Sequence, residues 1–202
     1  MKRDNFFAVN PFSHFADVLV PLPVQGYFTY GIPGEWMPGI REGARVVVRF
    51  GKKKIYTALV RNIHSAPPKG YEAKPILSLL DEKPLVTGNS FRFWEWMASY
   101  YMCSEGEVMN AALPSALKLE SESEIVLNPG AGIDQMILGE KEELVVEALR
   151  NRRTLQLTEV ARLLNQQKII PLVNTMLERG IILVKEELTG KYVPKKEVFV
   201  RL

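Results

Sequence analysis

The first half of the chain consists of short hydrophobic runs rich in aromatic and β-branched residues, the pattern of β-strands. Clusters of glycine and proline separate these runs, which lie at 16–20, 27–32, 44–50, 55–60 and 74–80. The third and fourth runs flank Gly51 and three lysines, which is typical of a hairpin with a basic tip. Five short strands in so few residues favour a small OB-like β-barrel.

After Ser90 the spacing of the hydrophobic residues changes to three and four. This spacing predicts a helix capped by Ser90, with a buried stripe formed by Phe91, Trp94, Met97, Ala98 and Tyr101. We interpret these aromatic residues as core rather than as a stacking platform for bases. Residues 105–113 predict a second short helix, so the barrel is expected to carry a helical appendage.

The second half of the chain has a different pattern. Polar, turn-forming residues at 119–138 predict a linker. Helical spacing then recurs at 140–150, 158–164 and 169–179, and strand-like runs follow at 181–185 and 197–201. Three helices and a hairpin form the order of a winged-helix domain, although the third helix offers few side chains that read bases.

These patterns together predict an α+β protein with two domains. We expect a leader at 1–15, a barrel domain at 16–118, a linker at 119–138 and a winged-helix domain at 139–202.

Charge is unevenly distributed over the 202 residues. The formal net charge is only +3, yet residues 41–74 hold nine basic and two acidic side chains. A basic block in a strand-rich segment is typical of a surface that meets phosphates, although lysines that protect an edge strand from aggregation give the same pattern. We expect DNA phosphate contacts from Arg45, Arg49, Lys52, Lys53, Lys54 and Arg61.

Residues 119–202 are close to neutral, with twelve basic and thirteen acidic side chains. Contacts with the DNA backbone are expected from the wing, through Lys191, Lys195 and Lys196. Contacts with another protein are an equally plausible alternative.

The sequence lacks the motifs of common catalytic classes. It contains no P-loop, no G-x-G-x-x-G, no H-E-x-x-H and no G-x-S-x-G. Its single cysteine, Cys103, cannot form an internal disulfide. One cysteine and the two histidines of the chain are too few for a tetrahedral zinc site of cysteine and histidine ligands. No apolar run approaches the ~18 residues of a membrane span. We therefore expect a cytoplasmic binding protein with no metal and no membrane contact.

Several short motifs follow one another in a specific order over about half of the chain. They are ADVLVPLP at 16–23, YFTY at 27–30, PGIREGARV at 38–46, FGK at 50–52, ASYY at 98–101, GEV at 106–108 and ALP at 112–114. In order and spacing they resemble the amino-terminal region of the PriA family of bacterial replication-restart helicases. That family places a winged helix next, and the resemblance implies a fragment that stops before the helicase lobes and their zinc-binding cysteines.

In that family the first domain is a 3′ DNA-binding domain, which holds the 3′-terminal nucleotide of the nascent leading strand. The resemblance carries its pocket over to Phe28, Thr29, Tyr30, Gly51 and Lys74. An aromatic ring offers a face to a base, glycine lets the backbone approach a sugar, and lysine meets phosphate. Thr29 replaces the family's aspartate, so a neutral hydroxyl stands where a charged acceptor is usual. From the pattern alone, Phe28 and Tyr30 share one strand face, and this favours a place in the core for both.

The resemblance implies a DNA-binding region that recognises stalled or branched forks. The full-length family is an ATP-dependent 3′ to 5′ DNA helicase that uses Mg²⁺, carries structural zinc, and contacts single-strand-binding protein and other primosome proteins. For the fragment we expect no cofactor and a monomer. The alternatives are a winged-helix regulator of duplex DNA, a protein-interaction adaptor without catalysis, and a small enzyme.

Overall fold

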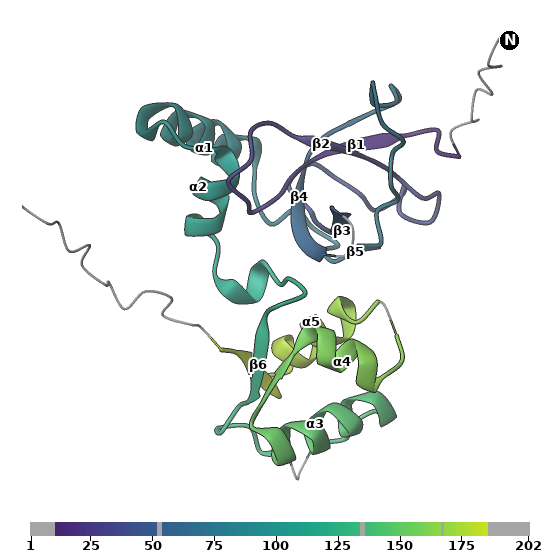
Figure 1. The fold of residues 1–202 in the computed structure, drawn as a ribbon, viewed down its shortest axis with the longest axis vertical. Helices are drawn as coiled ribbons and strands as arrows, with labels where there is room; N and C mark the ends of the chain where they lie inside the picture. The colour runs from purple at the N-terminus through teal and green to yellow at the C-terminus, as the bar shows by residue number, and fades with distance from the viewer. Residues whose placement is uncertain (1–10, 52–53, 134–135, 167, 186–202) are drawn as a thin grey trace, which may run out of the picture.

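The computed structural model describes residues 11–51, 54–133, 136–166 and 168–185. It shows two units, one above the other in Figure 1. The upper unit contains β1 (Phe15–Leu19), β2 (Phe28–Gly31), β3 (Arg45–Phe50), β4 (Lys54–His64), β5 (Ser78–Leu79), α1 (Gly88–Tyr101) and α2 (Glu105–Ala112). The short 3-10 helix η1 (Ser115–Leu117) leads to β6 (Glu124–Leu127), α3 (Glu140–Arg152), β7 (Thr154–Gln156), α4 (Leu157–Leu163), α5 (Ile170–Glu178) and β8 (Ile182–Val184). The expected mixture of helices and sheets is confirmed.

The upper unit is built on a five-stranded antiparallel sheet in the order β2-β1-β4-β3-β5. Its two edges meet at one point, where Gly31 donates to the Lys74 carbonyl (2.9 Å) and accepts from the Ile76 N–H (3.0 Å). This contact is an isolated parallel bridge between Gly31 and Pro75. Among the described residues the sheet therefore curls round without forming a closed barrel, and β5 is shorter than the strand expected at 74–80.

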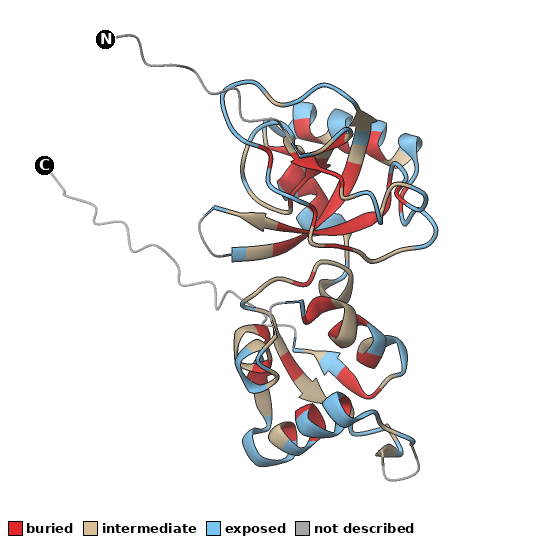
Figure 2. Ribbon diagram, turned by 90° about the vertical axis from the view of Figure 1, so that its right-hand side faces the viewer, coloured by how far each residue is buried: buried red, intermediate tan, exposed pale blue. Residues whose placement is uncertain are grey.

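The two faces of this sheet are buried against different partners. One face is lined by Val18, Val46, Val48 and Val60, which pack with the buried Tyr30 into a core inside the curl of the sheet. Figure 2 shows this buried interior in red, framed by exposed loops. On the outer face, Leu19 and Leu59 pack against α1 and α2. Hydrophobic residues therefore occupy both faces of β1 and β4.

Helix α1 begins earlier than expected and buries a narrower stripe. Its N-cap is Thr87, and Ser90 lies one turn inside, where its hydroxyl accepts from the Thr87 N–H (3.4 Å). Phe91, Trp94 and Ala98 are buried as predicted. Tyr101 is 65% exposed, so its placement in the core was wrong. The helix ends at Met102 in the left-handed conformation (φ 53°), which leaves the last turn beyond the packed face.

Helix α2 packs tightly against the chain that follows β1. A Cβ on Gly106 would collide with the carbonyl oxygens of Val20 and Leu22, so only glycine fits there. The Ser104 hydroxyl also donates to the Leu22 carbonyl (3.3 Å), and the Glu107 carboxylate accepts from the Ser104 N–H (2.9 Å) in a capping box. These contacts fix the start of α2 to the chain that follows β1.

The segment that joins the two units is itself paired with β4. Thr57 donates both its N–H and its buried hydroxyl to the Leu119 carbonyl (2.9 Å each), and Ser121 donates its N–H to the Ile55 carbonyl (3.1 Å). Beside them, Lys54 and Glu122 form an ion pair of 2.8 Å. Because β1 pairs only with the later part of β4, this segment takes the place next to the earlier part. The two units are therefore joined by a continuous hydrogen-bonded edge.

The lower unit contains the three helices expected of a winged helix, close to their expected positions. They pack against a three-stranded sheet in the order β7-β6-β8. Strand β6 lies in the segment 119–138 that was expected to be a linker, and β7 was also missed. Only the first strand of the expected hairpin, as β8, lies in the described residues, whereas 197–201 falls outside them. The division into domains stays a prediction.

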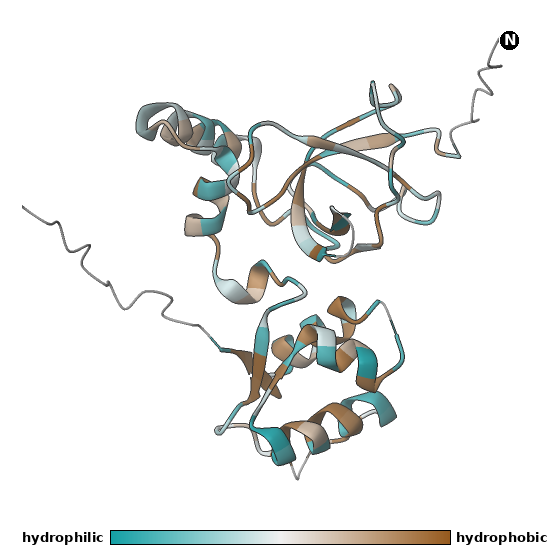
Figure 3. Ribbon diagram, viewed as in Figure 1, coloured by the Kyte–Doolittle hydropathy of each residue, from teal (hydrophilic) through white to brown (hydrophobic). Residues whose placement is uncertain are grey.

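The core of the lower unit lies between the helices and this sheet. It includes Ile125, Val145, Leu149, Val173 and Ile182, and Figure 3 shows hydrophobic residues gathered along these elements. Val47 of β3 belongs to the same cluster, so this core extends onto the outer face of the upper sheet.

A charged pair closes the lower core at its edge. Glu142 is 6% exposed, and its carboxylate accepts from the Gly139 N–H (2.9 Å) and from Arg179. Burial alone would raise the pKa of Glu142, but these two donors together lower it. The carboxylate is therefore ionised at neutral pH and ties the start of α3 to the end of α5.

The Thr57–Leu119 contact provides a test of how the units are joined. Thr57→Val keeps the shape and the backbone bond but removes the buried hydroxyl donor, so we expect a loss of about 1 kcal/mol in the free energy of unfolding. Urea denaturation measures it. Thr175→Val is the matched control, because the Thr175 hydroxyl bonds within α5 at an exposed position. Equal stability of Thr57→Val and the wild type would contradict this account of the joint.

Candidate nucleic-acid interface

Three of the residues expected in a 3′-end pocket meet at one end of the upper sheet. The Lys74 Nζ donates to the Gly51 carbonyl (2.7 Å). Next to Gly51, the Phe50 ring meets the Phe28 ring edge-on, with centroids 4.8 Å apart. We call Phe28, Phe50, Gly51 and Lys74 the hairpin-end cluster. Segments that are far apart in the sequence thus bring an aromatic pair, a glycine turn and a lysine together, in the combination that a nucleotide needs.

Gly51 opens the turn between β3 and β4 and has the left-handed backbone conformation (φ +64°) that only glycine adopts without strain. It is exposed, and a Cβ there would meet no atom within 4 Å. The requirement for glycine is therefore conformational, and the open space beside it leaves the backbone accessible to a ligand.

Tyr30 lies on the same strand face as Phe28 but belongs to the core. Its side chain is 5% exposed, and its hydroxyl donates to the Arg49 carbonyl (3.0 Å). Burial raises the pKa of Tyr30 to about 12, with a smaller contribution from Tyr71 nearby. The hydroxyl therefore stays protonated and holds the end of β3. For Tyr30 the core interpretation fits the structure, and its role is to support the cluster.

The Thr29 side chain points to the opposite face of β2, where it contacts a carboxylate. Its hydroxyl donates to Asp17 Oδ1 (2.7 Å), directly across from it on β1. His64 lies 3.1 Å from the same oxygen. The charged acceptor that Thr29 lacks is thus present on the neighbouring strand.

The backbone of Thr29 is also engaged, because its N–H donates to the Tyr71 hydroxyl (2.9 Å). Tyr71 is 52% exposed. Its hydroxyl oxygen occupies the Thr29 N–H at the edge of the sheet, and a ligand oxygen that displaced Tyr71 would reach the same donor.

Sequence reasoning missed Asp17, Phe50 and Tyr71. One signal was available for Asp17, which is the single charged residue in β1 and breaks its hydrophobic run.

The structure moves Arg45 out of the set of expected phosphate contacts. Arg45 is 5% exposed, and its guanidinium makes several hydrogen bonds to the Asp81 carboxylate, the shortest of them 2.7 Å. Asp81 also accepts from the Arg45 N–H (2.8 Å). A buried, paired guanidinium is a structural element, and it fixes the end of β5 to the start of β3.

The remaining basic positions differ in their availability. Lys54 is exposed beside the hairpin tip and pairs with Glu122, whereas the Arg49 side chain is half-buried. Arg61 is the extra residue of a bulge in β4, and its guanidinium lies 4.9 Å from the centre of the Phe91 ring and 3.1 Å from Glu42. Arg61 therefore faces α1, at the other end of β4. The remaining expected contacts, at Lys52, Lys53, Lys191, Lys195 and Lys196, lie outside the described residues.

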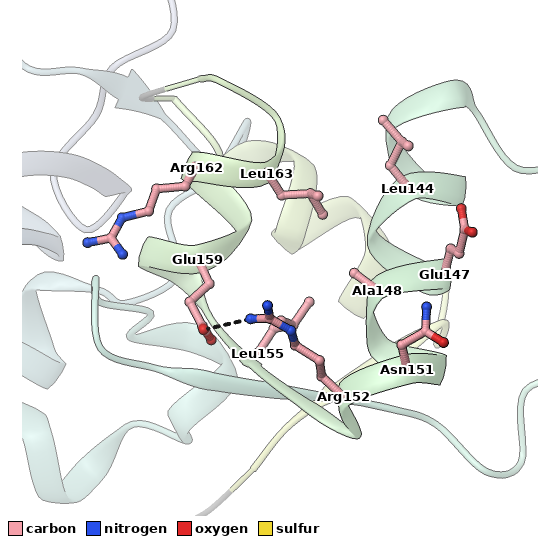
Figure 4. Close-up of a pocket in the computed structure, with 9 residues that line it drawn as sticks. All are labelled: Leu144, Glu147, Ala148, Asn151, Arg152, Leu155, Glu159, Arg162 and Leu163. Carbon is pink, nitrogen blue, oxygen red and sulfur yellow. Dashed lines mark hydrogen bonds and ion pairs between the residues drawn. The ribbon is translucent and has the colours of Figure 1, made fainter.

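Two hollows lie elsewhere in the molecule. One, of about 620 Å³, lies between α3 and α4, where Figure 4 shows the Arg152–Glu159 ion pair (3.2 Å) across it. It is lined by Leu144, Glu147, Ala148, Asn151, Arg152, Leu155, Glu159, Arg162 and Leu163. Its two arginines are balanced by two glutamates, so it has no net attraction for phosphate.

The second hollow lies at the junction of the two units and includes Glu120, Glu122 and Glu124 with Lys118 and Lys185. Burial, and then repulsion from Glu122, raise the pKa of Glu120. This acidic junction also disfavours phosphate.

The helix expected to read a DNA groove, α5, exposes few side chains that can contact bases. In α5, Ile170, Val173, Asn174 and Met176 are buried. Arg179, which follows the helix, donates to Glu142 and to the Ile137 carbonyl (2.7 Å). This agrees with the expectation that α5 is poor in base-reading groups.

Comparisons with known proteins identify both units. The model of the PriA 3′ DNA-binding domain matches residues 17–114, and a winged-helix domain model matches 122–187. The chain belongs to the PriA family. The Bacillus subtilis replication restart protein PriA is 26% identical over 152 residues, 72% of this chain and 19% of that protein. The Haemophilus influenzae PriA is 30% identical over 101 residues, 50% of this chain and 14% of that protein.

A third PriA, from Buchnera aphidicola subsp. Schizaphis graminum, is 28% identical over 101 residues, 50% of this chain and 14% of that protein. The chain thus spans a fifth or less of the length of these curated relatives. Both matched domain models describe binding modules, and neither describes a helicase domain. The resemblance to PriA is confirmed, and the first family model gives the upper unit a DNA-binding role.

In the part of the chain that the structure describes, no helix is long and apolar enough to cross a membrane. The same residues bring no three histidine, cysteine, aspartate or glutamate side chains together in a group that could hold a metal ion.

The reassignment of Arg45 can be tested by separating stability from DNA binding. Arg45→Met leaves the Asp81 carboxylate unpaired at a buried site, so we expect a loss of about 3 kcal/mol in unfolding free energy. The dependence of DNA affinity on salt should not change, because no phosphate contact is removed. Urea denaturation and binding titrations at several salt concentrations measure the two effects. A normal stability with a reduced salt slope would show that Arg45 meets phosphate.

Proposed function

We propose that this chain is the fork-recognition region of a replication-restart helicase, and that its first domain holds the 3′ end of a nascent leading strand. The observation that carries the proposal is the hairpin-end cluster, in which Lys74 reaches the Gly51 carbonyl beside the Phe28–Phe50 ring pair. A domain of this family that places an aromatic pair, an open glycine turn and an ammonium group side by side offers one nucleotide a stacking surface, backbone contact and a phosphate partner.

In this proposal the Lys74 ammonium exchanges the Gly51 carbonyl for a phosphate oxygen. A charge-assisted bond to phosphate is stronger than one to a neutral carbonyl, so the exchange favours binding. The terminal hydroxyl then meets the Asp17–Thr29 pair, and a sugar oxygen displaces the Tyr71 hydroxyl from the Thr29 N–H. Both faces of β2 are used, because β2 is an edge strand and Phe28 and Thr29 point to opposite sides of it.

Several properties of the whole protein belong to this proposal. We propose an OB-like character for the curled sheet, and a full-length protein that is an ATP-dependent 3′ to 5′ helicase using Mg²⁺ and carrying structural zinc. Forked DNA, single-strand-binding protein and other primosome proteins would be its partners, in the cytoplasm, with the present chain monomeric and free of cofactor. Contacts of the wing with the DNA backbone are part of the same proposal.

A titration with defined forks tests the function. The chain is titrated by fluorescence polarisation against three labelled forks that carry at the junction a 3′-hydroxyl, a 3′-phosphate, or no leading-strand end. We expect the tightest binding to the 3′-hydroxyl fork, because only this terminus fits beside Asp17 and Thr29. Equal affinities for the three forks would remove 3′-end recognition from the proposal.

Lys74 should account for one phosphate contact. Lys74→Met is expected to weaken binding to the 3′-hydroxyl fork and to lower the slope of log affinity against log salt by about one. Lys141→Met, an exposed lysine on α3, is the matched control and should change neither. A wild-type slope for Lys74→Met would mean that Lys74 does not meet phosphate in the complex.

The Asp17–Thr29 pair should carry the preference for a free hydroxyl. We expect Asp17→Asn to bind the 3′-hydroxyl and 3′-phosphate forks alike, because the charged acceptor is lost. Thr29→Asp alone should lower stability, because it places two carboxylates directly across the β1–β2 pair. Combining both changes returns one carboxylate to the site and should restore the preference, as polarisation titrations measure.

His64→Gln is the control for this series, because it removes the imidazole beside Asp17 and leaves Asp17 and Thr29 in place. A double variant that remains indifferent to the terminus, although folded, would show that neither position recognises the hydroxyl.

A further inference from the structure

Helix α1 carries a row of aromatic side chains on the face turned away from the sheet. Phe93 and Trp96 are each 57% exposed, Tyr100 is 67% exposed, and Tyr101 and Met102 continue the row at 65% and 92%. We call these five residues the aromatic ladder. Monomeric proteins rarely expose so many large apolar side chains next to one another, and such patches mark binding surfaces.

The ladder is ordered by contacts between its own rings. Phe93 stacks on Trp96 with centroids 5.9 Å apart and planes 16° apart, and Trp96 stacks on Tyr100 at 5.5 Å and 23°. Tyr100 then meets Tyr101 edge-on at 5.0 Å. The spacing of three and four residues brings Phe93, Trp96 and Tyr100 together on one helix face, and Tyr101 follows Tyr100 directly. Because each ring already covers part of its neighbour's face, the ladder offers a continuous side surface rather than separate slots for bases.

Charge around the ladder also disfavours nucleic acid. Residues 88–112 contain one cationic side chain, Arg92, and three carboxylates, Glu95, Glu105 and Glu107. Arg92 is held by a hydrogen bond to Asn89, one turn earlier. Single-stranded DNA binds stacking platforms that lie in positively charged grooves, whereas α1 and α2 together carry a net negative charge. A partner that complements it is apolar and basic.

We propose that the aromatic ladder is a docking surface for a protein segment that presents aliphatic side chains together with arginine or lysine. Tryptophan and tyrosine dominate the binding energy of protein interfaces. Their rings also attract cations, as Arg61 illustrates on the inner side of α1, where it lies over the Phe91 ring. Glu95 then supplies a carboxylate next to the rings for the partner's basic group.

This surface is separate from the hairpin-end cluster. Arg61, which packs on α1, is ten residues along β3–β4 from Gly51 at the hairpin tip, and the part of β4 between Lys54 and Arg61 alone spans roughly 23 Å. In Figure 1, α1 lies on the outer side of the upper unit, away from α3, α4 and α5. The chain can therefore hold DNA at one end of the sheet and a protein at the other, and this inference does not depend on the proposed 3′-end pocket.

The test uses the whole chain and defined probes. The main probe is a synthetic amphipathic peptide with leucine on one face and arginine on the other. A matched peptide has glutamate in place of arginine, and an oligothymidylate serves as the nucleic-acid probe. Amide chemical shifts locate the bound probe, and tryptophan fluorescence gives its affinity. We expect the arginine peptide to shift the amides of 92–103 and the other two probes to leave them unchanged.

Variants decide whether the ladder itself binds the peptide. Trp96→Ala combined with Tyr100→Ala should weaken peptide binding about tenfold or more, and Glu95→Lys should also weaken it. Ile137→Ala, at a position that is 92% exposed in the lower unit, is the matched control and should bind normally. Because all these side chains are exposed, thermal unfolding should stay close to that of the wild type.

Four results would overturn the proposal. The first is that the arginine peptide does not bind, and the second is that it binds the double ladder variant as tightly as the wild type. The third is that oligothymidylate shifts the α1 amides, which would make the ladder a nucleic-acid surface. The fourth is that sedimentation shows a dimer that the double variant abolishes, which would make a second copy of the chain the occupant.

Discussion

The structure depends on the pairing of β4, the longest strand. Its earlier part pairs with β3 on one side and with the 119–121 segment on the other, and its later part pairs with β1. A shift of one residue in a strand register moves every side chain to the other face. The register of β4 therefore fixes the hairpin tip at Gly51, the position of Asp17 and the attachment of the lower unit at the same time.

Two polar contacts complete what this pairing begins. Arg45 and Asp81 are paired in a nearly buried position at the start of β3, and the Lys74 ammonium bonds to the Gly51 carbonyl at its end. The first contact is shielded from solvent and costs much to break. The second is exposed, so its replacement by a ligand contact costs little. The same strand thus carries a permanent anchor at one end and an exchangeable contact at the other, which is suited to a binding site on a rigid support.

The sequence predicted the parts of the fold in which hydrophobic periodicity is strong. The five α-helices were placed within a few residues, as were β1 to β4, because each buries a regular stripe or face. Strands β6 and β7 were missed because they are short, contain polar residues, and form only through pairing across the lower unit. Arg45 was misjudged because its partner Asp81 is thirty-six residues away.

The candidate site shows the same division. Phe28, Gly51 and Lys74 were named from the resemblance, whereas Asp17, Phe50 and Tyr71 needed the register of the sheet. Apart from Tyr101, which was assigned to the core, the aromatic ladder was missed because the periodicity search followed Phe91, Trp94 and Ala98, the stripe that is buried. Tryptophan and tyrosine have middling hydropathy, and the colours of α1 in Figure 3 are mixed, so an average over the helix conceals its second face.

The distribution of charge explains why two different surfaces can work on one small unit. The basic residues that remain exposed at the hairpin end attract phosphate, while the carboxylates of α1 and α2 repel it over distances of about 8 Å at physiological salt. Arg61 does not add to either field at full strength, because Glu42 and the aromatic rings hold it against α1. Under the proposed function, DNA is drawn to the hairpin-end cluster and kept away from the ladder. A basic protein segment experiences the opposite preference, so the two ligands need not compete for the same surface.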